Sequence, residues 1–419
     1  MNKVLYLFDF DIRVAWAPAI QVMNTCAGFA AQGREVTLVN YYYLPWGNDR
    51  IRGDYWAYFG LAPTFRWQTL PTLLWKPLGH VPGAYRFIKA GPVMIYCAWL
   101  WLRWPFSEDD LIYGRSPGFI RIMPMLRRAK GNIPYPKIVY EAHEPLEGAG
   151  YRHLLHSVDG IVCLTQALAD YLHNQYGVPR ERLYVEGDAV SIEKFGVSLA
   201  PEEREAIRRR WRFPEGATIG CWAGWLNESE MNVLIEAAAH LDKSLGIVVI
   251  GGPVQLALKM EALAHVRRLP IRFIGPVPHR DVPKHLQAAD LLLCPYTGRL
   301  RWSPFFSPVK VFEYMAARRP IISSDLPAIR EVLRHGENAY LVPPDDPGAL
   351  ARAMKELSKS PDLQNHLVAG AWADAQAHTW ERRAQRILNF CDHLKVRSLA
   401  DRQERNEAQN QSSSFYRRS

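Results

Sequence analysis

The feature that most constrains the fold is a regular alternation of two patterns along the second half of this 419-residue chain. Apolar runs with strand character recur at Thr218–Ala223, Leu245–Ile250, Ile271–Ile274, Leu291–Cys294 and Pro320–Ser323. Stretches with helical periodicity separate them, at Glu230–Leu241, Val254–Val266, Arg280–Ala288, Pro308–Ala317 and Pro327–Leu333. Strands that alternate with helices predict a parallel sheet covered by helices on both faces.

The first half of the chain repeats this alternation less regularly. Strands are predicted at Val4–Phe8, Glu35–Asn40, Leu111–Tyr113, Lys137–Glu141, Val158–Leu164 and Leu183–Val185. Helices are predicted at Ala19–Gln32, Pro117–Ala129, Gln166–Gln175 and Glu202–Trp211. The length suits two domains of about 200 residues each. We therefore predict an α/β protein with two Rossmann-like domains, residues 1–198 and 199–380, that face each other across a cleft.

Three further segments complete the predicted organisation. A helix over 381–395 is expected to follow the second domain and to pack back onto the body. Residues 396–419 are polar and basic, which predicts a disordered tail. In an irregular insertion over about 41–106, basic residues are interleaved with tryptophans. These rings suit either an interfacial membrane surface or the core of the first domain; they are Trp46, Trp56, Trp67, Trp75, Trp99, Trp101 and Trp104.

Charge and cysteine usage bear on partners and compartment. The formal net charge of +9 suits an anionic partner, such as a nucleotide, a phospholipid surface or a nucleic acid, but it also suits a solvated basic surface. The six cysteines are scattered without a C-x-x-C pair, so neither a zinc site nor a disulfide framework is expected. The longest apolar stretch, Gly91–Leu102, is too short for a bilayer span, and the first apolar run breaks at Asp9. We therefore predict a cytoplasmic protein without a signal peptide.

Residues 307–313 carry the most specific local chemistry. Ser307 before Pro308 predicts a capped helix start, because Ser favours the N-cap and Pro favours the first helical position. The free N–H groups and partial positive charge of a helix start suit a diphosphate. Lys310 would add a full charge in the first turn, and Glu313 would offer a carboxylate to a ribose diol. The alternative is a capped helix whose Lys and Glu face solvent.

The stretch that contains this helix resembles a known signature. Ser307-Pro-Val-Lys-Val-Phe-Glu-Tyr-Met-Ala, continued by Gly336-Glu-Asn-Ala-Tyr-Leu-Val-Pro-Pro-Asp-Asp, resembles the donor-domain signature of the family-four glycosyltransferases, which are retaining GT-B enzymes. Weaker matches precede it in the expected order, at Val185-Glu-Gly-Asp, Ala223-Gly-Trp, Ile250-Gly-Gly-Pro, Phe273-Ile-Gly-Pro-Val and Ala289-Asp-Leu-Leu. The resemblance implies a GT-B fold, a nucleotide-sugar donor, retention of configuration, and neither a metal nor another cofactor.

The resemblance also implies roles for individual residues. The matching Glu of the family binds the nucleotide ribose, which points to Glu313, and Lys310 would act as a catalytic residue that stabilises the leaving diphosphate. Arg272 or Val277 would lie near the base. The donor-binding candidates are Gly224, Gly252, Gly275, Val277, Ser307, Pro308, Val309, Lys310 and Glu313.

Polar residues that follow strands of the first domain are candidates for the other side of the cleft. His143 matches the place of a sugar-contacting His in the family, and it is a catalytic candidate because a neutral imidazole can hydrogen-bond a sugar hydroxyl or the leaving oxygen. The alternative is a histidine satisfied within a turn. Arg115 and Gln21 are candidates for binding the acceptor or the phosphates. Asp9-Phe-Asp11 has the form of a D-x-D metal motif, but that motif belongs to the other glycosyltransferase fold, so no metal ligand is predicted.

Three positions depart from the family pattern. Phe305 stands where many members carry a glutamate that usually contacts the donor sugar. Trp225 and the run Glu228-Ser-Glu230 stand where an Arg and a Lys usually grip the diphosphate, so Lys310, Arg299 or Arg301 would have to compensate. Trp16-Ala-Pro-Ala-Ile-Gln replaces a glycine-rich loop of the first domain.

Together these features predict a glycosyltransferase of polysaccharide biosynthesis that moves a sugar from a nucleotide-sugar to a glycan or lipid-linked acceptor. A lipid-linked acceptor would bring the enzyme into peripheral contact with an anionic membrane, at the inner face of the plasma membrane, and no nucleic-acid partner is expected. The missing cations leave two alternatives open. One is a degenerate GT-B protein that binds a sugar nucleotide or a partner without catalysis, and the other is a membrane-peripheral scaffold.

Overall fold

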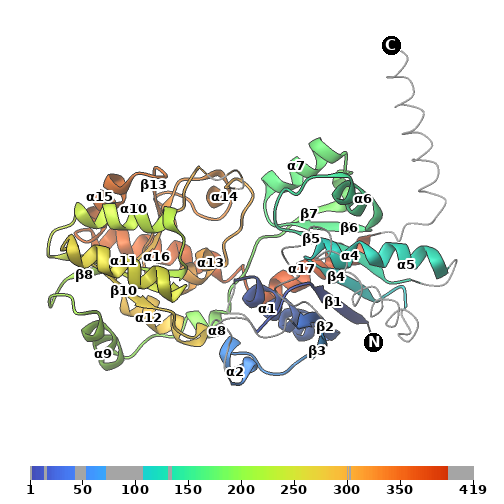
Figure 1. The fold of residues 1–419 in the computed structure, drawn as a ribbon, viewed down its shortest axis with the longest axis horizontal. Helices are drawn as coiled ribbons and strands as arrows, with labels where there is room; N and C mark the ends of the chain where they lie inside the picture. Colours follow the sequence, from blue (N-terminus) through green and yellow to red (C-terminus); the bar gives the residue numbers. More distant parts are fainter. Residues whose placement is uncertain are drawn as a thin grey trace, which may run out of the picture.

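The computed structural model describes residues 2–13, 17–42, 53–71, 107–130, 135–299, 301 and 303–394. These residues form two lobes, each built on one parallel sheet (Figure 1). The first sheet takes its strands from residues 3–185 and the second from residues 218–342. The predicted α/β architecture with two Rossmann-like sheets is therefore confirmed.

The N-terminal sheet comprises β1 (Lys3–Phe8), β2 (Glu35–Tyr42), β3 (Arg66–Pro71), β4 (Leu111–Gly114), β5 (Lys137–Ala142), β6 (Gly160–Cys163) and β7 (Leu183–Val185). Its helices are α1 (Ala17–Ala31), α2 (Tyr55–Phe59), α4 (Pro117–Ile120), α5 (Ile122–Lys130), α6 (Ala149–Ser157), α7 (Gln166–Tyr176) and the short η2 (Arg180–Arg182). The strand order is β3-β2-β1-β4-β5-β6-β7, and it reverses direction beside β1, as in doubly wound folds. Along β1, Tyr6 and Phe8 pack with residues of α1, whereas Leu5 and Leu7 pack with residues of α4 to α7.

The C-terminal sheet comprises β8 (Thr218–Trp225), β9 (Leu245–Gly252), β10 (Ile271–Gly275), β11 (Leu291–Cys294), β12 (Ile321–Ser324) and β13 (Tyr340–Val342), in the order β10-β9-β8-β11-β12-β13. The helices are α8 (Ile192–Phe195), α9 (Pro201–Trp211), α10 (Glu228–Ala239), α11 (Val254–Val266), η3 (His279–Asp281), α12 (Val282–Ala288), α13 (Val309–Ala316), α14 (Pro327–Arg330), α15 (Pro347–Leu357) and α16 (Pro361–Ala375). One face of the sheet packs with residues of α12, α13 and α16, and the other with residues of α10, α11 and α15.

Helix α17 (Trp380–His393) follows the second domain and packs against α1 of the first domain (Figure 1). The two helices approach closely at Gly28, where a Cβ atom would lie 2.6 Å from the carbonyl oxygen of Trp380. Ala384, Ile387 and Cys391 are buried in the same cluster as the side chains of α1. The last described helix of the chain therefore contributes to the core of the first domain.

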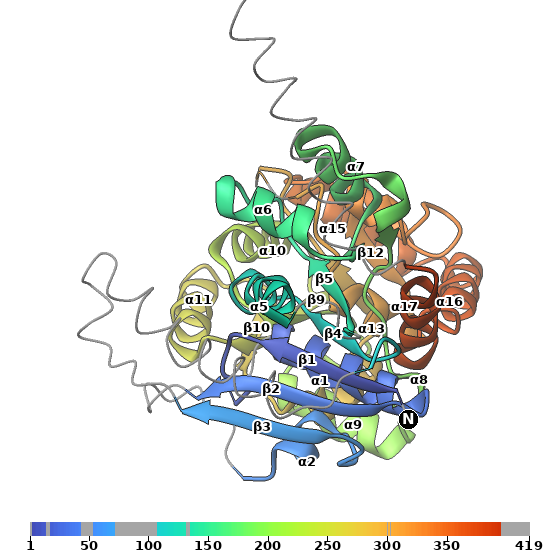
Figure 2. The ribbon, with the colours of Figure 1, turned by 90° about the vertical axis from the view of Figure 1, so that its right-hand side faces the viewer.

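Part of the predicted insertion is regular. β3 extends the N-terminal sheet as the parallel neighbour of β2 at its edge (Figure 2). Trp67 donates from Nε1 to Oδ1 of Asn40 at 2.7 Å, and Trp56 packs against the same core. These two rings favour the core-packing interpretation. The predicted tail over 396–419 lies outside the described residues, as do Trp46, Trp75, Trp99, Trp101 and Trp104.

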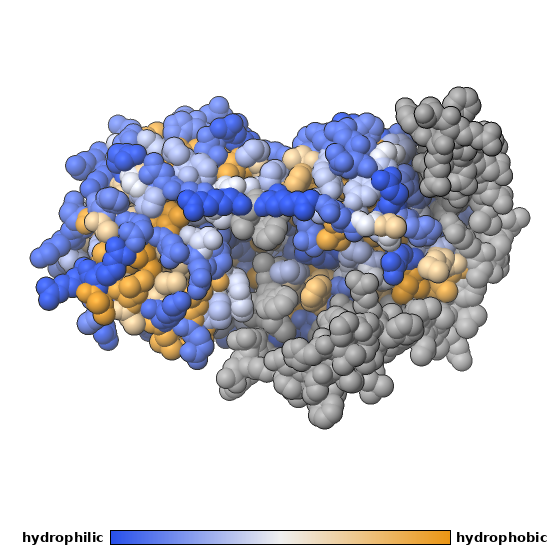
Figure 3. Space-filling model, turned by 45° about the horizontal axis from the view of Figure 1, so that its top comes forward, coloured by the Kyte–Doolittle hydropathy of each residue, from blue (hydrophilic) through white to orange (hydrophobic). Residues whose placement is uncertain are grey.

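Two predicted helices begin or continue differently. The helix expected over Pro117–Ala129 is interrupted at Arg121, because Pro124 has no N–H to donate to the carbonyl of the preceding turn. The helix expected from Pro308 begins one residue later, at Val309. None of the described helices is long and apolar enough to cross a bilayer. Figure 3 shows one face of the molecule, where hydrophobic side chains gather mainly on the lobe formed by the second domain.

Candidate functional site

The carboxyl ends of the two sheets meet at a junction that several cross-domain contacts hold together. The backbone N–H of Asp188 donates to Oγ of Ser307 at 3.0 Å, and the backbone N–H of Gln166 donates to the carboxylate of Glu331 at 2.9 Å. Beside these contacts lies a pocket lined by residues of both domains, namely Leu164, Thr165, Ser307, Pro308, Val311, Phe312, Ala328, Ile329, Glu331 and Val332. Helix α13 starts at this junction, which brings the predicted donor signature to face the first domain.

The start of α13 differs from the predicted cap. Pro308 occupies the N-cap position, and Ser307 does not cap the helix because its hydroxyl accepts the N–H of Asp188 instead. The prediction of a Ser307 cap is therefore wrong, and Ser307 is a cross-domain contact. Val309 is the first helical residue. The first N–H groups of a helix have no acceptor within it, so the start of α13 still suits an anion.

Lys310 reaches from α13 toward the end of β8. Its Nζ lies 4.1 Å from the ring centroid of Trp222 and 5.2 Å from that of Tyr296. The same atom lies 3.5 Å from Oε2 of Glu230, which also accepts Nε1–H of Trp222 at 3.0 Å. Lys310 is thus enclosed by two rings and one buried carboxylate, and Glu230 occupies the place where the family resemblance implies a cation.

Gly224 makes room for this lysine. Its φ of +152° is a conformation that glycine favours, and a Cβ atom there would lie 3.1 Å from Nζ of Lys310. The donor-binding candidate Gly252 lies next to the end of β8, because Trp225 pairs with it across the sheet. Gly252 also lies close to the loop after β10, since a Cβ atom on it would lie 3.7 Å from Pro276. Gly275 ends β10 at φ +83°, and Val277 packs partly buried against the second domain's core. The loops after β8, β9 and β10 therefore lie next to one another, beside α13.

Glu313 has a partner that the sequence analysis missed. Its Oε1 lies 2.8 Å from Nε2 of His279, and both residues are buried. His279 starts η3, directly after the loop of Gly275 and Val277 that the resemblance assigns to the nucleotide pocket. The sequence shows only that a histidine follows this loop. Its contact with Glu313 is formed by the fold.

The first domain contributes a cluster of polar side chains that contact one another around Glu141. This residue is fully buried near the end of β5. Its carboxylate accepts hydrogen bonds from Gln21 and Tyr113, lies 2.6 Å from Nε2 of His143, and forms an ion pair with Arg383 at 3.1 Å. Burial alone would raise the pKa of Glu141, but Arg383, His143 and Tyr113 together hold it well below its ordinary value. Arg383 comes from α17, which explains why sequence reasoning did not connect it with this site.

His143 is neutral in this cluster. Burial and the nearby Arg115 lower its pKa to about 4, although the carboxylate of Glu141 acts in the opposite direction. Because an ionised carboxylate can only accept, Nε2 of His143 carries the proton and Nδ1 keeps its lone pair. The imidazole is therefore suited to accept a hydrogen bond from a hydroxyl group.

Gln21 and Arg115 belong to the same network. Gln21 is buried, and its amide donates to Glu141 and accepts from Arg115 at 3.2 Å. Both the amide nitrogen and the amide oxygen of Gln21 have partners within the protein. Gln21 is therefore placed to orient Arg115, not to contact a ligand. Arg115 is only partly buried and remains the candidate of the two for contact with an acceptor or phosphate.

The structure does not group Arg299 and Arg301 with Lys310. The side chain of Arg299 is 82% exposed and lies 3.8 Å from Asp345, while Arg301 is 75% exposed and pairs with Glu147 of the first domain. Both arginines are thus engaged by acidic residues at the surface. Their predicted compensation for the missing cations has no support from these contacts.

Within the described ranges, no group of three or more His, Cys, Asp or Glu side chains is placed to hold a metal ion. Asp11 of the D-x-D sequence forms an ion pair with Arg13 at 2.6 Å.

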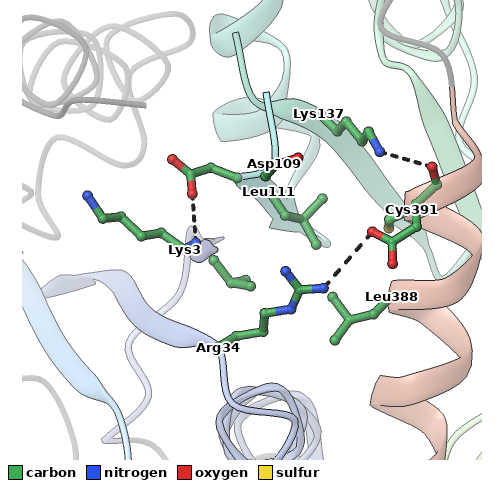
Figure 4. A pocket seen from close by; sticks show the side chains of 10 residues that line it. Lys3, Arg34, Asp109, Leu111, Lys137, Leu388 and Cys391 are labelled. Atoms are coloured by element: carbon green, nitrogen blue, oxygen red, sulfur yellow. Dashed lines mark hydrogen bonds and ion pairs between the residues drawn. The ribbon is translucent and has the colours of Figure 1, made fainter. Parts of the chain in front are cut away.

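A second pocket lies where β1, β4 and β5 begin, lined by Lys3, Leu111 and Lys137 together with α17 (Figure 4). Arg34 and Lys137 both contact Asp392 there, so this pocket marks where α17 seals the first domain at the end opposite the junction.

Two parallel-sheet Rossmann-like domains whose strand ends face a shared junction define the GT-B fold. The comparisons agree with this architecture. Residues 217–360 match the family model described as glycosyl transferases group 1. The chain is 27% identical over 270 residues to the D-inositol 3-phosphate glycosyltransferase of Streptomyces bingchenggensis, covering 61% of this chain and 56% of that protein. It is 28% identical over 259 residues to the corresponding protein of Streptomyces griseus, covering 56% of this chain and 54% of that protein. The chain thus matches little more than half the length of these curated relatives.

Solved structures match over nearly the whole chain. Anabaena Alr3699/HepE in complex with UDP and glucose gives a TM-score of 0.69 at 15% identity, covering 94% of this chain and 100% of that one. Sucrose-phosphate synthase from Thermosynechococcus elongatus gives a TM-score of 0.69 at 16% identity, covering 92% of this chain and 97% of that one. At these identities the likeness establishes the GT-B fold.

Proposed function

We propose that this chain is a glycosyltransferase that uses a nucleotide-sugar donor. The observation that carries the proposal is the placement of Lys310 and Glu313 on one helix that starts at the junction, each held by a partner from another element. The relatives named as D-inositol 3-phosphate glycosyltransferases support transfer chemistry. The neighbouring structures with UDP and with UDP-glucose make a uridine diphosphate sugar the first donor to test.

The donor would bind with its diphosphate at the start of α13. The free N–H groups of the helix and the ammonium of Lys310 supply positive charge there. The carboxylate of Glu313 would accept hydrogen bonds from the ribose diol, three residues further along the helix. The loops that follow β8, β9 and β10 would border the nucleotide on the same side, close to Gly224, Gly252 and Gly275.

The reaction would break the bond between C1 of the sugar and the diphosphate oxygen, and form a bond from C1 to the acceptor oxygen. Lys310 would stabilise the charge that develops on the leaving diphosphate. His143, which is neutral, would hold a sugar hydroxyl through Nδ1. For retention of configuration, the acceptor would attack from the face that the diphosphate leaves, and the leaving phosphate oxygen would take the acceptor's proton. No metal or other cofactor is included in this proposal.

The acceptor side belongs to the proposal as well. A glycan or lipid-linked acceptor would enter beside Arg115 and His143. A lipid-linked acceptor would require peripheral contact with the cytoplasmic leaflet of a membrane. The basic surplus of the chain, with a formal charge of +9, supports attraction to anionic headgroups.

One observation favours a second candidate function. Glu230 places a negative charge 3.5 Å from Lys310, where a leaving diphosphate needs positive charge. This arrangement suits a protein that binds a sugar nucleotide without transferring the sugar. The two functions differ in turnover, not in binding.

The test is a turnover assay with radiolabelled UDP-, GDP- and ADP-sugars. Wild type would be compared with Lys310→Ala, with and without a membrane extract as the acceptor source. Transfer or slow hydrolysis of one donor, lost in Lys310→Ala, supports the glycosyltransferase. A donor that binds but never turns over under either condition supports the binding protein.

A further inference from the structure

Asp188 is a buried carboxyl group whose bonding is incomplete. It is 3% exposed, and its backbone N–H donates to Ser307 across the junction. Its Oδ1 atom is fully buried and has no hydrogen-bond partner among the described residues. A buried polar atom without a partner is destabilising, so a ligand that supplies a hydrogen-bond donor to this oxygen would be favoured.

The surroundings place this carboxyl group between the two halves of the site. It interacts electrostatically with Arg383 of α17, with Glu141 and Arg115 of the first domain, and with Glu313 of the second. The preceding Gly187 allows α13 to approach closely, since a Cβ atom there would lie 3.4 Å from both Oγ of Ser307 and the ring of Phe312. The carboxyl group is therefore held beside the start of the donor helix.

Acceptors for hydroxyl groups are scarce at this junction. Both oxygens of Glu141 are engaged by residues of the first domain, and Glu230 is engaged by Trp222 and Lys310. Phe305 turns to the first domain, where its ring packs 5.5 Å from that of Tyr171 and against the core. A sugar that follows a diphosphate at α13 presents several hydroxyl donors, and these require acceptors.

We infer that the Asp188 carboxylate binds hydroxyl groups of the donor sugar. The inference rests on the proposed function and adds a residue that selects the sugar rather than the nucleotide. Because Oδ1 is closed off in the present arrangement, the sugar would reach it when the domains move apart at the contact of Ser307 with Asp188. Domain opening and closure around substrates is common among two-domain enzymes.

The test compares binding of a nucleotide-sugar with binding of the bare nucleotide. Calorimetry at pH 8 would measure UDP-glucose and UDP on wild type, Asp188→Asn and Glu186→Gln, with the GDP and ADP pairs tested in the same way. Burial raises the pKa of Asp188 to about 7, so the group is ionised at pH 8. Glu186 is a matched control, because it is a buried carboxylate two residues away that pairs with Arg386 at 2.7 Å.

The inference predicts that Asp188→Asn weakens binding of the sugar nucleotide about 10- to 100-fold while its affinity for the bare nucleotide stays within about two-fold of wild type. Glu186→Gln should change neither. Equal losses for both ligands, or no loss for either, would overturn the inference and leave the proposed function intact. If wild type binds no member of the panel, the proposed function fails and this inference fails with it. Asp188→Ser repeats the comparison with a smaller polar side chain should the Asn variant not fold.

Discussion

Nε2 of His279 lies 2.8 Å from Oε1 of Glu313, and this contact joins the loop after β10 to helix α13. The pair fixes one oxygen of a carboxylate that the proposal assigns to the nucleotide ribose. Under this proposal, His279 is a positioning residue, because it would act on the nucleotide through Glu313.

Removing this positioning contact should weaken nucleotide binding. His279→Ala is expected to raise the Kd for UDP about 5- to 20-fold, because nucleotide binding would lose part of the about 1.5–3 kcal/mol that a hydrogen bond to a charged group contributes. His279→Asn, which keeps a donor, should recover part of the loss. Calorimetry would check this, with exposed His265→Ala on α11 as the control. Wild-type affinity in His279→Ala would remove His279 from the account.

Neutralising Glu230 should have the opposite effect on diphosphate binding. Gln can still accept Nε1–H of Trp222, but it no longer opposes the charge of Lys310. Glu230→Gln is therefore expected to tighten UDP binding about 3- to 10-fold and to leave uridine binding unchanged. The control is Glu228→Gln, because Glu228 is 68% exposed and pairs with Lys259. An equal change for UDP and uridine would contradict a specific effect on the diphosphate.

The role of His143 can be tested through pH. Its pKa is lowered to about 4, so the ring stays neutral at any pH above about 5 and gains its proton only below that range. The rate of donor turnover, plotted against pH, should therefore show no change near pH 6.5, the ordinary pKa of histidine, that is due to His143. His143→Gln should lower kcat about 10- to 100-fold without changing the shape of the pH–rate profile from pH 5 to 8. A limb near pH 6.5 that disappears in His143→Gln would contradict a neutral role.

Replacing Arg383 should lower the free energy of unfolding. It pairs with the fully buried Glu141, so Arg383→Met would leave a buried carboxylate without its countercharge. The expected loss is about 3–5 kcal/mol in the free energy of unfolding. Chemical denaturation would measure it, with the exposed neighbour Arg382→Met as the control. A loss no larger than that of Arg382→Met would show that the other donors to Glu141 suffice.

The sheets could be predicted because alternation of apolar runs and helical periodicity is a local signal. β3 was missed since Arg66–Pro71 is an edge strand with polar residues and a terminal proline, which lack that signal. Helix α13 could be predicted because its periodic residues, with Lys310 and Glu313 among them, lie next to one another in sequence. Its cap could not, because the N–H of Asp188 competes for the Ser307 hydroxyl only in the folded chain.

The partners of the site residues could not be predicted either, because they come from distant parts of the sequence. His279 meets Glu313, and Arg383 meets Glu141, through tertiary packing that no spacing in the sequence expresses. Glu230 was visible as a departure from the family pattern, but its contact with Lys310 depends on the close approach allowed at Gly224. Local motifs thus predicted the helix that the proposal assigns to the donor, and the fold supplied the residues that contact it.

The most direct test of the central claim is the affinity of wild type and Glu313→Ala for UDP-, GDP- and ADP-sugars, measured by calorimetry. The account predicts that one nucleotide series binds to wild type and that Glu313→Ala weakens it about ten-fold or more, because the ribose loses its acceptor. Binding that is unaffected by Glu313→Ala, or no binding of any donor to the wild type, would contradict the assignment of α13 as the donor site.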